Sequence, residues 1–132
     1  MTFVLDASVV VACVMPDETS QRATAVLGRL TKTHAIVPSL WSYEVASAIH
    51  NAARRGRMTE ADAALALRSL VNLPLTHVEP EPTRLIEIAQ MTGLTVYDSS
   101  YLALSMSRGL PLATFDDRLA AAAIKAGVQI LA

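Results

Sequence analysis

The chain has 132 residues, of which 52% are hydrophobic and 17% are charged. This length and composition suit one continuous core, so we expect a single domain over residues 1–132. The net charge of −1 excludes a nucleic-acid binder that works through an overall basic field. The longest apolar run, Val9 to Met15, is far shorter than the about 20 residues of a membrane span, and the N-terminus lacks a basic leader. We therefore expect a cytoplasmic protein without membrane contact.

The only cysteine, Cys13, lies inside this apolar run. A lone cysteine forms no internal disulfide, which agrees with a reducing compartment. We expect Cys13 to be buried as a small hydrophobic side chain.

Short apolar runs alternate with helical patterns along the first half of the chain. The elements expected there are a strand over Phe3–Leu5, a short helix over residues 9–14 with Ser8 as its N-cap, a helix from Ser20, a strand over Ala35–Val37, a helix from Ser39 to Gly56, and a helix opened by the capping pattern of Thr59 and Asp62.

The second half continues the same alternation. Its expected elements are a strand over Leu75–Val78, a loop through Pro80 and Pro82, a helix that stops at Gly93, a helix capped by Asp98 or Ser99 that ends at Gly109, a strand over Leu112–Phe115, an alanine-rich segment over Leu119–Ala126, and a strand over Val128–Leu131. Alternating elements with short apolar strands predict an α/β fold with a mainly parallel sheet covered by helices on both sides.

Acidic residues follow several of these strands. Asp6 and Asp116 each follow a strand, Asp98 opens a helix, and Glu44 lies beside the buried stripe of the helix after Ala35–Val37. In a parallel sheet the carboxyl ends of the strands share one edge, so we expect the four carboxylates to gather there. Each aspartate taken alone is better explained as a helix cap.

A gathered cluster needs more than capping. A cap contributes on the order of 1 kcal/mol, whereas two carboxylates about 4 Å apart repel by roughly 4 kcal/mol at an effective dielectric constant of 20. A hard divalent cation offsets this repulsion, and a ligand set of oxygens alone favours Mg²⁺ or Mn²⁺ over zinc. The hydroxyls of Ser8, Ser99 and Thr114 are candidates for binding metal-bound water.

A cation at such a site activates water and stabilises charge on a phosphodiester, so phosphate-ester hydrolysis is the expected chemistry. Arg118 is a candidate phosphate contact, and a plain surface role is equally compatible with it. The cluster Arg54, Arg55 and Arg57 is interpreted as a solvated helix end in preference to an RNA contact.

Four segments in order carry a resemblance to a known family. They are V-L-D-A-S at Val4 to Ser8, Y-E-V-A-S-A-I at Tyr43 to Ile49, Y-D-S-S-Y-L-A-L-S at Tyr97 to Ser105, and L-A-T-F-D at Leu112 to Asp116. Together they resemble the PIN-domain ribonucleases, and most closely the VapC-type toxins of toxin–antitoxin pairs. The resemblance covers nearly the whole chain.

The resemblance implies a three-layer α/β/α PIN-like fold and a metal-dependent endoribonuclease that uses Mg²⁺ or Mn²⁺. It also implies a homodimer, an RNA substrate and inhibition by a cognate antitoxin protein. Asp6, Glu44, Asp98 and Asp116 match the acidic catalytic and metal-binding positions of the family. The spacing from Thr114 assigns the fourth acid to Asp116, and Asp117 beside it stays open as an alternative.

Two other functions remain open at this point. One is a non-catalytic PIN-like binding module whose acids serve only as helix caps. The other is an aspartate-based phosphatase or phosphotransfer domain with Asp6 as its nucleophile. The segment Asp6–Ser8 lacks the second aspartate that one common phosphatase pattern uses, which makes this the weaker of the two.

Overall fold

A computed structural model describes residues 1–17 and 20–131. Within these residues the strands form one five-stranded parallel sheet in the order β3-β2-β1-β4-β5. The strands are β1 (Phe3–Leu5), β2 (Ala35–Val37), β3 (Leu75–His77), β4 (Leu112–Ala113) and β5 (Ile130–Leu131). The expected parallel sheet is confirmed, with β1 at its centre.

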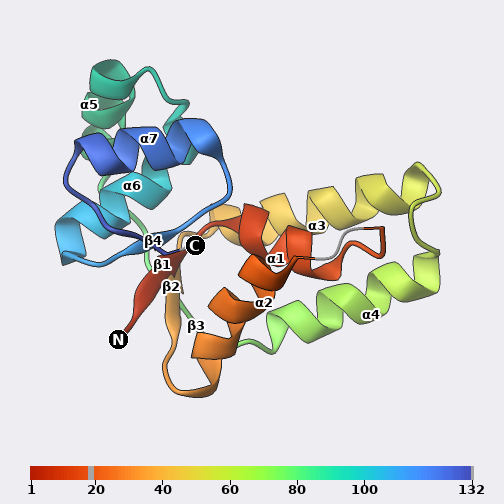
Figure 1. Cartoon of the computed structure of the whole chain (residues 1–132). Coiled ribbons are helices and arrows are strands. Elements are labelled where there is room, and N and C mark those ends of the chain that lie inside the picture. The colour runs from red at the N-terminus through yellow and green to blue at the C-terminus, as the bar shows by residue number, and fades with distance from the viewer. Residues whose placement is uncertain (18–19, 132) are drawn as a thin grey trace.

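Helices cover both faces of this sheet. They are α1 (Ala7–Val14), α2 (Gln21–Gly28), the 3-10 helix η1 (Arg29–Thr31), α3 (Leu40–Arg54), α4 (Glu60–Val71), α5 (Pro82–Thr92), α6 (Val96–Arg108) and α7 (Asp117–Lys125). Figure 1 shows α1 to α4 on one side of the sheet and α5 to α7 on the other. The expected three-layer α/β/α fold is therefore confirmed.

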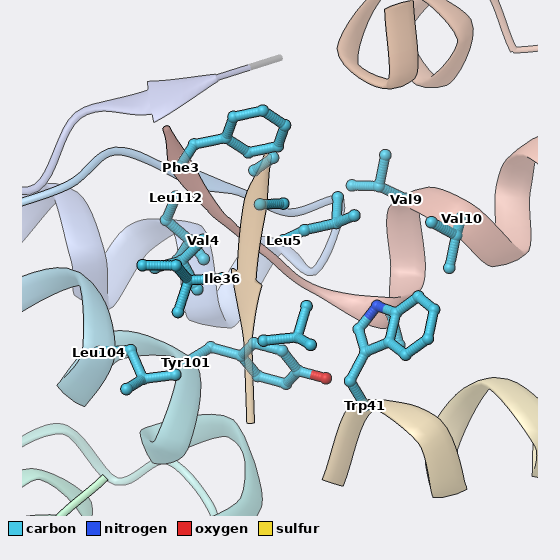
Figure 2. Close-up of a cluster of buried hydrophobic side chains, with 14 of the residues drawn as sticks. Phe3, Val4, Leu5, Val9, Val10, Ile36, Trp41, Tyr101, Leu104 and Leu112 are labelled. Atoms are coloured by element: carbon cyan, nitrogen blue, oxygen red, sulfur yellow. The ribbon is translucent and has the colours of Figure 1, made fainter. Parts of the chain in front are cut away.

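The core is centred on β1, whose residues Phe3, Val4 and Leu5 are all completely buried. Successive side chains of a strand point to opposite faces, so β1 contributes to both helical layers. Trp41 from α3 and Tyr101 from α6 both pack into this cluster, with the hydroxyl of Tyr101 pointing toward the side of Trp41 (Figure 2). Burying one such side chain contributes about 1.5–3 kcal/mol, which explains why so short a strand holds its place.

Helix starts are where the structure differs most from the sequence-based expectation. The first helix begins at Ala7, so Asp6 and not Ser8 occupies its N-cap position. The expected loop through Pro80 and Pro82 ends one residue early, because Glu81 caps α5 and Pro82 is its first residue, where its missing N–H costs nothing. The helices α6 and α7 also begin earlier than expected, at Val96 and Asp117.

The last two strands also differ from the expected ranges. The strands β4 and β5 are shorter than the expected Leu112–Phe115 and Val128–Leu131. The expected cap Thr59 is confirmed, since its hydroxyl accepts a hydrogen bond from the backbone N–H of Asp62. Ser20 caps α2 in the same way, by accepting from Ala23 N.

Cys13 is exposed, so the expectation that it is buried is wrong. Its segment forms helix α1, and a helix buries only the face that meets its neighbours. Val9 and Val10 lie on that face and are fully buried, while Cys13 lies outside it. A helix formed by an uninterrupted apolar run is therefore buried here on one face only.

Arg57, in the basic cluster at the end of α3, forms an ion pair with Asp17. Arg57 Nη2 lies 2.6 Å from Asp17 Oδ1, and both side chains are partly exposed. An exposed pair of this kind contributes about 0–1 kcal/mol. In the part of the chain that the structure describes, every helix is too short or too polar to cross a bilayer.

Candidate active site

The parallel sheet brings Asp6 and Asp116 to one edge. Asp6 directly follows β1, and Asp116 lies three residues after the end of β4, the strand that pairs with β1. Asp98 lies in the first turn of α6, and Glu44 lies near the start of α3. The charges of Asp6, Asp98 and Asp116 act on one another, and those of Asp6 and Asp98 act on Glu44. All four predicted acids are thus brought together electrostatically.

Asp6 is the most buried of these acids, with an exposed fraction of only 5%. Its Oδ2 atom accepts hydrogen bonds from Ser8 Oγ at 2.7 Å and from Thr114 Oγ1 at 2.6 Å. Burial raises the pKa of Asp6, the two hydroxyl hydrogen bonds lower it, and the charge of Asp116 raises it further. The net pKa is raised, because desolvation of the carboxylate is the largest effect.

The two hydroxyls are fixed in direction by the backbone. Ser8 Oγ accepts a hydrogen bond from Phe115 N at 3.0 Å, and Thr114 Oγ1 accepts one from Asp116 N at 3.0 Å. A hydroxyl that accepts from an N–H group directs its own hydrogen elsewhere, here to Asp6. Both hydroxyls donate to the same carboxylate oxygen, Oδ2, and together they hold the Asp6 side chain in place.

Glu44 is positioned by a residue of the opposite helical layer. The hydroxyl of Tyr101, from α6, donates a hydrogen bond to Glu44 Oε1. Figure 2 shows the ring of Tyr101 crossing from α6 with its oxygen directed toward the side of Trp41 and α3. Burial, the charge of Asp6 and the bond to Glu44 all raise the pKa of Tyr101, so its hydroxyl stays protonated and remains a donor.

The pKa of Glu44 is itself raised, first by partial burial and then by the charges of Asp6 and Asp98, with the Tyr101 hydrogen bond opposing the shift. Sequence reasoning placed Tyr101 only on a helix face and missed this role. A buried tyrosine needs a partner for its hydroxyl, and that requirement was the available signal.

Asp98 is not a helix cap, contrary to one sequence-based expectation. The helix α6 begins earlier, at Val96, and Thr95 caps it by accepting a hydrogen bond from Asp98 N at 3.0 Å. Partial burial raises the pKa of Asp98, as do the charges of Asp116 and Asp6, while Arg118 lowers it. In this cap the backbone N–H of Asp98 is the donor, and its carboxylate interacts electrostatically with Asp116 and Asp6.

Asp116 does cap its helix, since its Oδ1 accepts a hydrogen bond from Leu119 N at 2.9 Å. Asp117 is the first residue of α7 and is exposed. Asp116 acts electrostatically on Asp6 and Asp98, and no such effect of Asp117 on them is found. The position of Asp116 fits the cluster better than that of Asp117, and capping explains only this one of the three aspartates.

Ser99 and Arg118, the two remaining predicted residues, differ in burial and in hydrogen-bond partner. Ser99 is fully buried and its hydroxyl donates to Thr95 O at 2.7 Å, so the structure does not direct it to the carboxylates as it does Ser8 and Thr114. Arg118 is exposed, lies near Asp98, and donates from Nη2 to Gly93 O at 3.2 Å. Arg118 is thus anchored at the rim of the acidic cluster.

The donor set fits a hard divalent cation. It consists of carboxylate oxygens, the ligands that Mg²⁺ and Mn²⁺ prefer, and the raised pKa values of three of them record charge that a cation would neutralise. As the side chains stand in the described residues, no three Asp, Glu, His or Cys side chains are close enough to hold an ion between them. Their coupling in this state is through charge alone.

The raised pKa values predict how stability changes with pH in a chelating buffer. Above the ordinary pKa values of 3.8 for Asp and 4.5 for Glu, the unfolded chain has lost protons that the folded chain still holds. Stability from these groups is therefore present below these values and is lost as pH rises through the raised pKa values.

We expect the melting temperature of the chelated protein to rise when pH is lowered from neutral to about 5, and saturating Mn²⁺ to raise it at neutral pH. Thermal unfolding followed by circular dichroism measures both changes. A melting temperature that only falls on acidification would contradict the destabilisation by burial and mutual repulsion of these carboxylates.

One buried and three half-buried carboxylates at the carboxyl edge of a parallel sheet define the class of α/β domains with an acidic ligand site between the layers. A family comparison agrees with this geometry. Residues 3–125 match the model of the PIN domain family. The chain belongs to the PIN domain family.

Relatives with known names extend this result. Ribonuclease VapC3 of Pyrobaculum aerophilum is 33% identical over 124 residues, which cover 91% of this chain and 93% of that protein. Ribonuclease VapC3 of Mycobacterium tuberculosis is 34% identical and covers 90% of this chain and 85% of its own length. PAE2754 of Pyrobaculum aerophilum has a similar structure, with a TM-score of 0.76, 26% identity, and 99% of this chain and 84% of that chain covered.

FitAcB from Neisseria gonorrhoeae also has a similar structure, with a TM-score of 0.67. The alignment covers 100% of this chain and 97% of that one. Sequence identity is 16%, so this likeness supports the fold alone.

Proposed function

We propose that this protein is a divalent-metal-dependent endoribonuclease and the toxin component of a toxin–antitoxin pair. The observation that carries the proposal is the set of raised carboxyl pKa values at one sheet edge, in a PIN-domain chain whose relatives are named ribonucleases. Perturbed carboxylates that gather at a ligand crevice are typical of catalytic centres.

Asp6, Glu44, Asp98 and Asp116 would hold Mg²⁺ or Mn²⁺, with the carboxylate of Asp6 held in place by the hydroxyls of Ser8 and Thr114. When bound, such an ion supplies a nucleophilic water and stabilises charge that develops on the phosphodiester. The metal also reverses the sign of the local field, which removes the objection that an acidic site repels RNA.

The surrounding residues act by position. Ser8 and Thr114 hold the carboxylate of Asp6 through Oδ2, and Tyr101 holds that of Glu44 through Oε1. Preorganised groups need little rearrangement during the reaction, which is how neighbouring side chains contribute to catalysis. Arg118, which donates to Gly93 O, would bind a phosphate oxygen of the RNA.

Within this proposal the protein is a cytoplasmic single domain over residues 1–132 whose activity is inhibited by a cognate antitoxin protein. The named relatives support this assignment by their VapC names. The antitoxin partner depends on the assignment of this chain as the toxin of such a pair.

A homodimer is part of the proposal. Several large apolar side chains are exposed, among them Tyr43, Val71, Met91, Tyr97 and Ile124. Exposed apolar side chains beyond the scattered few of an ordinary surface favour self-association. We expect light scattering to give a dimer mass at micromolar concentration, and a monomer at the highest concentration would contradict this expectation.

Incubation of the purified protein with total cellular RNA tests the activity. Parallel reactions contain Mg²⁺, Mn²⁺ or a chelator, and the new RNA ends are mapped by sequencing. We expect discrete cuts with metal and none with the chelator. If no cleavage occurs and calorimetry detects no Mn²⁺ binding, the chain is better explained as a binding module.

A further inference from the structure

Arg22 lies on the rim of the acidic cluster, on the opposite helical layer from Arg118. It is an exposed residue in the first turn of α2. Its guanidinium carbon lies 4.8 Å from the centroid of the Phe115 ring. This is a cation–π contact, in which the flat guanidinium rests on the face of the aromatic ring.

The ring beneath Arg22 belongs to the site itself. Phe115 lies between Thr114 and Asp116, and its backbone N–H donates to Ser8 Oγ at 3.0 Å. Ser8 in turn donates to Asp6 at 2.7 Å. The guanidinium therefore rests on a residue that the hydrogen bonds around Asp6 hold in place.

No carboxylate among residues 1–17 and 20–131 forms an ion pair with Arg22, although Asp116 directly follows Phe115 in the chain. Arg57 and Arg84, in contrast, are paired with Asp17 and Glu87. A guanidinium that is stacked by its face keeps its N–H donors free along its edges. Those edges suit the two oxygens of a phosphate, which a guanidinium binds in a bidentate manner.

We propose that Arg22, stacked on Phe115, binds a backbone phosphate of the RNA next to the one that is cut. This inference rests on the proposed ribonuclease function and adds a second anion contact to Arg118. Figure 1 shows α2 and α7 on opposite sides of the sheet, so Arg22 and Arg118 approach the acidic edge from the two helical layers. The RNA backbone would thus run across the carboxylates with a cation on each side.

Binding of a fluorescently labelled, mixed-sequence, single-stranded RNA tests this proposal. The titrations use the Asp98→Asn protein with Mg²⁺, so that the RNA stays intact, and compare it with the same protein carrying Arg22→Gln. We expect the added substitution to weaken binding about tenfold, the loss of one charge-assisted hydrogen-bonded contact. The slope of log affinity against log salt should fall in magnitude by about 0.7, the value for one phosphate of a single strand.

Arg108→Gln is the matched control. Arg108 is an exposed arginine at the opposite end of α6 from Asp98, and its replacement changes the net charge equally. We expect this control to bind RNA as its parent does, Arg22→Lys to retain part of the affinity, and Phe115→Leu to weaken binding because the platform is lost.

Two results would overturn the inference. One is unchanged RNA affinity in the Arg22→Gln protein, and the other is an equal loss in the Arg22→Gln and Arg108→Gln proteins, which would indicate only a general field. Both can occur in a protein whose wild type cuts RNA, so failure of the Arg22 site is distinguishable from failure of the proposed function. Melting temperatures of all variants show whether each one is folded.

Discussion

Replacing Asp98 with Asn is expected to lower the rate of RNA cleavage about 1000-fold, equivalent to about 4 kcal/mol of transition-state stabilisation, while the fold is kept. Asparagine has nearly the volume of aspartate but loses the charge that a metal ion needs. The helix start is unaffected, because Thr95 and not Asp98 caps α6. Cleavage of total cellular RNA with Mg²⁺ or Mn²⁺ measures the loss.

The chain contains a closely matched control in Asp62→Asn. Asp62 occupies the same place in α4 as Asp98 in α6, since its backbone N–H donates at 3.0 Å to the capping hydroxyl of Thr59. Asp62 is exposed, and its charge is not among those that shift the pKa of Asp6 or Asp98. Equal activity of the Asp98→Asn protein and wild type would refute the site, as would an equal loss in the control.

Asp98→Asn is also expected to stabilise the chelated protein. The substitution removes one of the mutually repelling carboxylates, and relief of active-site strain of this kind commonly raises the melting temperature by a few degrees, about 3 °C here. Calorimetry should show weaker Mn²⁺ binding by the same variant. A gain in stability together with loss of metal binding separates a ligand position from a merely structural one.

Thr114→Val has the second largest expected effect, a loss of about 10–100-fold in cleavage rate. Valine has nearly the shape of threonine but lacks the hydroxyl that donates to Asp6 Oδ2 and accepts from Asp116 N. Asp6 loses a donor that lowers its pKa, and the pKa rises further. The Asp116 N–H group also loses its partner, which costs about 1–3 kcal/mol where it is shielded from water.

Thr114→Ser is the conservative comparison, because it keeps the hydroxyl and removes only a methyl group. We expect most of the activity to return in this variant. The pH at which activity rises should shift upward in the Thr114→Val protein and stay near the wild-type value in the serine variant. Unchanged cleavage kinetics and an unchanged pH profile in the valine variant would show that Thr114 does not position Asp6.

Some residues of the candidate site were predictable from the sequence and others were not. Asp6 and Asp116 follow strands that pair in parallel, so their convergence is predictable once the strands are recognised. Arg118 was identified from its position beside these acids. Tyr101 and Arg22 were not, because the first reaches Glu44 across 57 residues of sequence and the second meets Phe115 from another helix. Local sequence patterns carry no information on side-chain contacts between distant segments.

Hydrophobic periodicity and the geometry of parallel strands are enough to predict the alternation of strands and helices and the parallel sheet, and they lead to the expectation that four acids lie at one edge. Only the tertiary structure decided which acids act as caps, which face of α1 is buried, and how Asp6 and Glu44 are held. Those features depend on desolvation and on side-chain contacts between distant segments. Both arise only when the helical layers pack on the sheet, so no local stretch of sequence encodes them.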